Sequence, residues 1–149
     1  MKGRLTNIGL RVELLNLFGN NIMGKISVIN ITKDNDYSCE DGFFYIGRSK
    51  KTSSPLGNPY TYNGKRTNIA KLTLRTRQEA IDAYERYFDY MYGRDESFTK
   101  AFDEIYECYK SGKDVYLGCF CKPEPCHGDI IAKKLQQKLI KEKREELKK

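Results

Sequence analysis

The sequence predicts an α/β fold, a small layered, Rossmann-like domain with a short, partly parallel sheet flanked by helices. Three observations lead to this class. Apolar, β-branched runs alternate along the chain with segments whose apolar residues recur at helical spacing. The length of 149 residues suits one domain with a core of its own. The 11 tyrosines and 7 phenylalanines supply aromatic bulk that disordered chains lack.

The domain boundaries follow from the two ends of the chain. Residues 1–22 are weakly apolar and end in a Gly-Asn-Asn turn signal, so they form either an added helix or an appendage before an alternative start at Met23. Residues 141–149 are almost all charged. We therefore expect an N-terminal appendage over 1–22, a single domain over 23–140, and a charged C-terminal helix end or tail over 141–149.

Two strands are expected in the first half of the domain. Residues 25–32 are rich in β-branched side chains, and residues 43–46 form a short apolar run that stops at a glycine. Residues 47–75 hold Gly, Pro, Asn and Lys with little periodicity. A loop of that length inside a domain is usually functional or mobile, so this segment is a candidate part of a binding site.

Two helices and a third strand follow. Thr76 and Glu79 form the capping pattern that begins a helix, and Gly93 ends it. Aromatic and apolar residues at helical spacing predict a second helix, which ends at Gly112. A third strand is expected over residues 114–121.

The composition indicates an anionic partner and a reducing compartment. The 27 Lys and Arg outnumber the 20 Asp and Glu, for a net charge of +7. Nucleic acid, nucleotides and phosphorylated metabolites all suit that balance. No apolar run approaches the roughly 18 residues of a membrane span, so no membrane partner is expected. The 5 cysteines are an odd number that cannot all pair, which favours the cytoplasm.

The segment Cys119-Phe-Cys-Lys-Pro-Glu-Pro-Cys-His-Gly-Asp129 leads from the third strand into a last predicted helix. In open α/β sheets ligands bind at the carboxyl ends of strands, and a helix N-terminus favours an anion. The only histidine, His127, and Asp129 are the candidate catalytic acid or base, and Asp129 is also the natural N-cap. The candidate ligand-binding residues of this segment are Cys121, Lys122, Cys126 and Gly128.

Other interpretations of the same segment remain open. Four soft ligands suit zinc, but their spacing is unusual for a structural zinc site, so the preferred interpretation has no metal. A nucleophilic cysteine at Cys126 is a further alternative. A purely structural interpretation makes Cys119 a buried apolar residue and uses the prolines to shape the turn. The zinc set would be Cys119, Cys121, Cys126 and His127.

A second motif follows the second predicted strand. Arg48 can bind a phosphate or carboxylate through two hydrogen bonds, and Asn58 carries the donor and acceptor groups that suit a base edge or a ribose. The alternative is a surface turn with a solvated arginine. The candidate ligand-binding residues of this motif are Gly47, Arg48, Ser49, Gly57 and Asn58.

These two motifs, together with Arg-x-Glu-Ala-Ile-x-x-Tyr at residues 77–84, resemble the domain-of-unknown-function family DUF4326. The resemblance covers about residues 25–139. The usual Arg-Pro-Ser turn of the family appears here as Arg48-Ser49-Lys50, and its usual Trp between two cysteines is Phe120. The family occurs in bacteria, archaea and many phages. The resemblance implies a site at these motifs and a cytoplasmic setting, and it implies no particular reaction and no particular cofactor.

The function expected from these observations is binding of a phosphate-bearing nucleotide or nucleotide-derived small molecule, which is either sequestered or hydrolysed. The pocket would lie between residues 47–59 and residues 121–129. Arg48 and the helix N-terminus would hold phosphate, and Asn58 or Asp129 would read the sugar or base. The alternative is a nucleic-acid-binding module, with or without the zinc described above. A third hypothesis is a protein-interaction domain whose motifs are structural.

Overall fold

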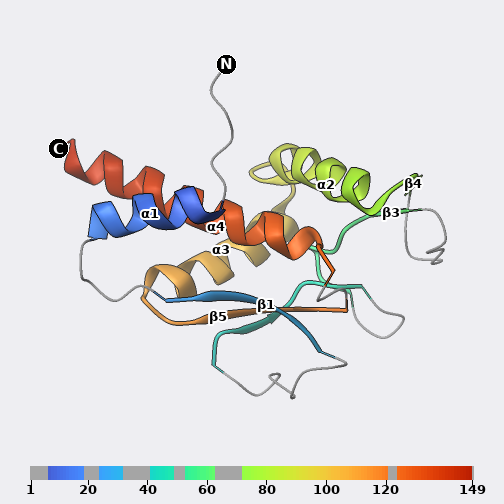
Figure 1. Ribbon diagram of the computed structural model, residues 1–149, viewed down its shortest axis with the longest axis horizontal. Helices are drawn as coiled ribbons and strands as arrows, with labels where there is room; N and C mark the ends of the chain where they lie inside the picture. Colours follow the sequence, from blue (N-terminus) through green and yellow to red (C-terminus); the bar gives the residue numbers. More distant parts are fainter. Residues whose placement is uncertain are drawn as a thin grey trace.

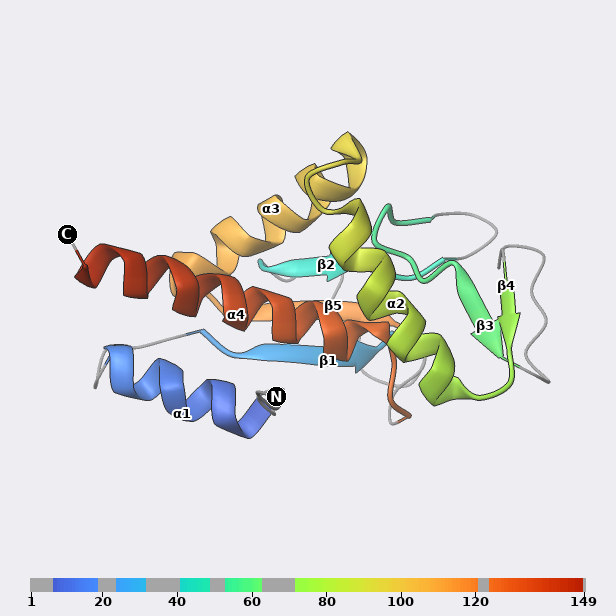
Figure 2. The same cartoon turned by 90° about the horizontal axis from the view of Figure 1, so that it is seen from above.

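The computed structural model describes residues 7–18, 24–31, 41–48, 53–62, 72–120 and 124–148. Parallel strands form one layer, and the helices gather on one face of it, as the two perpendicular views of Figures 1 and 2 show. This arrangement confirms the predicted α/β class. No helix in these ranges combines the length and the apolar character needed to cross a membrane.

The main sheet has three parallel strands in the described part of the chain. Its order is β1 (Ile26–Asn30), β5 (Val115–Cys119) and β2 (Phe43–Tyr45). β5 therefore lies in the middle, although it comes last in the sequence. All three strands end at the same edge of the sheet, so the residues that follow them are brought together there.

A second pair of strands lies in the segment that we expected to be a loop. β3 (Tyr60–Tyr62) pairs in parallel with β4 (Leu72–Leu74), and both contact α2 (Arg77–Met91). The prediction of a loop over residues 47–75 is wrong at these positions. Strands of three residues are too short to display the alternation of period two by which strands are recognised.

The helix α2 begins where the local capping signal predicts. The hydroxyl of Thr76 accepts a hydrogen bond from the backbone N–H of Glu79 at 3.1 Å, which confirms the N-cap of α2. The chain then turns at Gly93, whose φ of 88° favours glycine, and continues as α3 (Glu96–Lys110).

The two terminal helices, α1 (Asn7–Phe18) and α4 (His127–Leu147), pack against each other, and α4 lies over β1 and β5 (Figure 2). Leu10 and Leu14 of α1 are fully buried in the main core. Residues of the expected N-terminal appendage therefore contribute to the core of the domain. α4 stays helical to Leu147, well into the charged tail.

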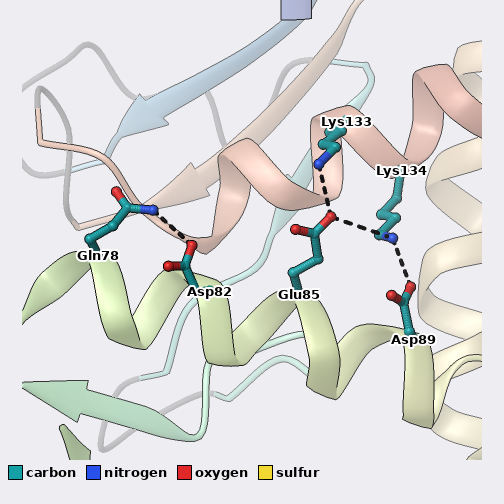
Figure 3. A network of polar contacts seen from close by, with 6 residues as sticks. All are labelled: Gln78, Asp82, Glu85, Asp89, Lys133 and Lys134. Carbon is teal, nitrogen blue, oxygen red and sulfur yellow. Dashed lines mark hydrogen bonds and ion pairs between the residues drawn. The ribbon is translucent and has the colours of Figure 1, made fainter. Parts of the chain in front are cut away.

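Buried charges join α2 to α4. The carboxylate of Glu85 accepts a hydrogen bond from Lys133 at 2.9 Å and lies 3.7 Å from the ammonium of Lys134 (Figure 3). Lys134 also donates to Asp89 at 2.7 Å. Because the side chain of Glu85 is only 7% exposed, this network holds the two helices in one relative position.

Candidate functional site

His127 joins the two sequence motifs at the first turn of α4. Its Nε2 lies 2.6 Å from the carbonyl oxygen of Ile46, a residue 81 positions away in the sequence. A carbonyl can only accept, so the ring donates through Nε2–H. The imidazole is only 6% exposed, and the ring of Tyr84 packs against it edge-on with centroids 5.0 Å apart. The side chain therefore ties the Gly47–Arg48 turn to α4 from inside the protein.

The N-cap of α4 is Cys126, so the prediction that Asp129 fills this position is wrong. The thiol of Cys126 accepts a hydrogen bond from the N–H of Gly128 at 3.3 Å. The carboxylate of Asp129, one turn into the helix, accepts from the N–H of Cys126 at 3.1 Å. This reciprocal capping box supplies the start of the helix with a sulfur and a carboxylate from its own chain.

Gly128 lies where α4 meets the sheet. A Cβ at this position would lie 2.7 Å from Val28 Cγ1 and 2.9 Å from Ile46 Cδ1. The lack of a side chain thus lets the helix approach the strands closely. This packing role is an alternative to the ligand contact that we expected at Gly128.

Two thiols of the Cys119–Asp129 segment lie close together. The sulfur atoms of Cys119 and Cys126 are 3.5 Å apart, and both residues are buried. Within the described ranges no three His, Cys, Asp or Glu side chains gather closely enough to hold a metal ion. Cys121, which the zinc alternative needs as its fourth ligand, lies outside the described residues, as do Ser49 and Lys122.

The side chain of Arg48 packs against Gly57 within a tight loop. A Cβ on Gly57 would lie only 2.4 Å from Arg48 Cγ, so the arginine side chain passes directly over the glycine. The loop folds back on itself because the N–H of Ser54 donates to the Gly47 carbonyl at 3.0 Å and Arg48 forms a β-bridge with Ser53. The motif residues Gly47, Arg48 and Gly57 therefore form one compact unit.

The guanidinium of Arg48 is half-buried beside phenol rings. Burial lowers the pKa of Arg48, while the nearby Tyr45 and Tyr87 oppose that change. Burial also raises the pKa of the Tyr87 phenol, and Arg48 acts against it. The ring of Tyr60 packs edge-on against Tyr87, with centroids 6.2 Å apart. Arginine remains charged in such a setting, so Arg48 offers a partly desolvated cation next to aromatic rings.

Asn58 uses both ends of its amide within the protein. Its Nδ2 donates to the Ala80 carbonyl at 3.3 Å, and its Oδ1 accepts from the N–H of Tyr60 at 2.9 Å. These bonds fix the loop on the first turns of α2. The atoms that we expected to read a sugar or base are thus engaged by the backbone of the chain itself.

Sequence reasoning missed three aromatic residues around this unit. Tyr45 and Tyr87 lie near Arg48, and Phe120 follows the central strand β5. Tyr45 and Phe120 are in edge-on contact, with centroids 6.1 Å apart. Tyr45 and Phe120 could have been selected by their position, since each lies near the end of a predicted strand beside a motif residue.

An open groove of about 800 Å³ lies elsewhere, over the turn between α2 and α3. Most of its charged residues are acidic, among them Asp95, Glu96, Asp103 and Glu107. Carboxylates repel a phosphate, so this groove does not suit the anionic ligand that the composition favours.

Comparison with protein families gives a match. A family model described as a domain of unknown function, DUF4326, matches residues 29–137. The matched region runs from β1 into α4 and includes both motifs. Comparison with curated proteins and with solved structures gave no match.

Proposed function

This chain belongs to the DUF4326 family, and we propose that it binds a phosphate-bearing nucleotide or nucleotide-derived small molecule beside Arg48. The observation that carries the proposal is the junction between the Arg48 loop and the first turn of α4, made by the bond from His127 to Ile46. Two motifs of specific, non-periodic sequence meet at this junction, at the carboxyl edge of a parallel sheet, where ligands of such folds bind.

Arginine supplies the anion-binding part of the proposed site. Arg48 follows β2 and lies near Tyr45 and Tyr87, and Arg77 donates to the Pro125 carbonyl at 3.1 Å, just before α4. The capping box places the Asp129 carboxylate at the helix N-terminus. For this reason we assign the phosphate to Arg48 rather than to the helix end. The net charge of +7 favours the approach of an anion.

Binding is better supported than hydrolysis. His127 is buried and donates through Nε2 to the Ile46 carbonyl, and the Asp129 carboxylate accepts from the N–H of Cys126. Both candidate catalytic residues therefore have structural roles. We propose that His127 positions the arginine loop and that the protein binds or sequesters its ligand. A cytoplasmic location is part of this proposal, supported by the odd number of cysteines.

The test compares two arginine variants by calorimetric titration with AMP, ADP, ATP and NAD. Arg48→Gln should weaken binding roughly tenfold to hundredfold, since it removes a charged hydrogen-bond donor to phosphate. Arg86→Gln is the matched control, because Arg86 is exposed on α2 and loses the same charge. Equal affinities of wild type and Arg48→Gln, or no binding by the wild type, would refute the proposal.

Nucleic-acid binding is the second candidate, favoured by the net charge alone. In the described part of the chain, four lysines of α4 are already engaged by acidic residues, namely Lys133, Lys134, Lys138 and Lys143. Titration of a single-stranded and a double-stranded oligonucleotide at two salt concentrations separates this candidate from the first. A steep loss of affinity with salt, unaffected by Arg48→Gln, would favour nucleic acid.

A further inference from the structure

Phe120 is an aromatic side chain left on the surface at the end of the central strand. Phe120 is 44% exposed, although β5 itself is largely buried. The backbone is held firmly, because the Phe120 carbonyl accepts a hydrogen bond from Asn30 Nδ2 at 3.2 Å. The Tyr45 ring lies in a T-shaped arrangement with the Phe120 ring, at an interplanar angle of 73°. An exposed ring on a fixed backbone suits the stacking of a planar group.

Phe120 lies at the same edge of the sheet as the proposed anion site. β5 is flanked by β1 and β2, so its carboxyl end emerges between theirs. Tyr45 connects the two features. Its ring contacts Phe120, and its hydroxyl oxygen lies 2.9 Å from where a Cβ of Gly47 would stand, next to Arg48. The exposed ring of Phe120 and the cation of Arg48 thus lie along the same edge of the sheet.

The polar groups expected to read a base have other partners. The amide of Asn58 is bonded at both ends, to Ala80 and Tyr60, and the carboxylate of Asp129 caps Cys126. Stacking does not require such groups, because every nucleobase has a π-face. Phe120 is the exposed aromatic side chain that the described part of this sheet edge offers for that purpose.

We propose that Phe120 binds the planar ring of the ligand, while Arg48 binds its phosphate. The inference rests on the proposed function and makes it more specific. The ligand is then a phosphate ester that carries an aromatic base, such as a purine or pyrimidine nucleotide, rather than a sugar phosphate without a base or inorganic phosphate. Recognition by stacking tolerates different bases, so purine and pyrimidine nucleotides should bind with similar affinities.

The experiment titrates AMP, UMP and ribose 5-phosphate into wild type, Phe120→Ala and Phe120→Leu. Wild type should bind the nucleotides at least tenfold more tightly than ribose 5-phosphate. Both variants should lose about tenfold or more in nucleotide affinity, because the stacking of the base on the Phe120 ring is lost. Their affinity for ribose 5-phosphate should not change. Tyr90→Ala is the control, since Tyr90 is 64% exposed on α2.

The outcomes separate the two proposals. If wild type binds nucleotides and ribose 5-phosphate equally and the Phe120 variants match it, the stacking role is wrong and the anion site stands. If wild type binds none of the three ligands, both proposals are wrong. Phe120→Leu keeps apolar bulk without a π-face, so it gives the answer even if Phe120→Ala does not fold.

Discussion

Gly57 and Arg48 show at the scale of single residues how a loop can hold a cation in place. The arginine side chain lies where a Cβ on Gly57 would be, so its aliphatic part packs on the bare backbone. A longer residue at Gly57 must displace either the loop or the arginine. The identity of this one residue therefore controls the direction in which the proposed anion-binding group points.

Gly57→Ala should lower anion affinity and reduce the free energy of unfolding by roughly 1–3 kcal/mol, the usual cost of an added methyl group in a packed place. Binding is measured by calorimetry and stability by urea denaturation. In an Arg48→Ala background most of the stability cost should disappear, because the nearest clash involves Arg48 Cγ at 2.4 Å. Additive effects of the two substitutions would contradict the packing of Arg48 on Gly57.

At the scale of helices, the position of α2 against α4 depends on charges within their contact. α2 contributes Ala80, which accepts from Asn58, and α4 contributes His127, which donates to Ile46. Both helices thus hold parts of the loops that form the proposed site. The buried network between them secures their relative position, and with it the spacing of these loops (Figure 3).

Glu85→Gln should destabilise the protein by roughly 2–4 kcal/mol, because it leaves Lys133 with a largely buried and uncompensated charge. Asp89→Asn is the matched control. The Asp89 side chain is 61% exposed, so its loss should cost less than about 1 kcal/mol. Urea denaturation measures the free energy of unfolding of both variants. Equal stabilities of the two variants would show that the buried network contributes no more than a surface ion pair.

At the scale of the whole molecule, the core is rich in tyrosine. Burial raises the pKa of Tyr84 well above its usual range and that of Tyr109 to about 12. The pKa of Tyr106 is raised as well, by burial and then by its hydrogen bond to Glu142, which measures 2.6 Å. These phenols therefore remain neutral in the native state at a pH where those of the unfolded chain ionise.

The protein should accordingly lose stability in alkali. The folded-state pKa of Tyr109 lies above that of an unfolded tyrosine, about 10, so its contribution is complete below about pH 10 and is lost as the pH rises towards 12. Tyr109→Phe should reduce the slope of unfolding free energy against pH in this window by up to about 1.4 kcal/mol per pH unit. Urea denaturation at several pH values measures the slope.

Tyr90→Phe is the control for that experiment, because Tyr90 is exposed on the surface of α2. An unchanged slope in Tyr109→Phe would show that Tyr109 ionises at the same pH in the folded and unfolded chains. The absorbance of tyrosinate gives a second measurement. In wild type, part of it should appear only together with unfolding.

The sequence alone determined the elements whose signals are local. The N-cap of α2 at Thr76 and the strands β1, β2 and β5 could be predicted because capping, helical spacing and β-branching act between near neighbours. The two motifs were also visible in the sequence, since glycines and arginines at strand ends need no tertiary information to be recognised as candidates.

Only the tertiary structure decided the strand order, the β3–β4 pair and the partners of the motif residues. The bond from His127 to Ile46 spans 81 positions, and the contact between Tyr45 and Phe120 crosses from β2 to β5. Such contacts depend on which strands become neighbours, which is a property of the packed chain as a whole. For this reason the sequence could indicate only the residues of a candidate site, while folding decides that Asn58 is engaged by the backbone and that Phe120 remains exposed.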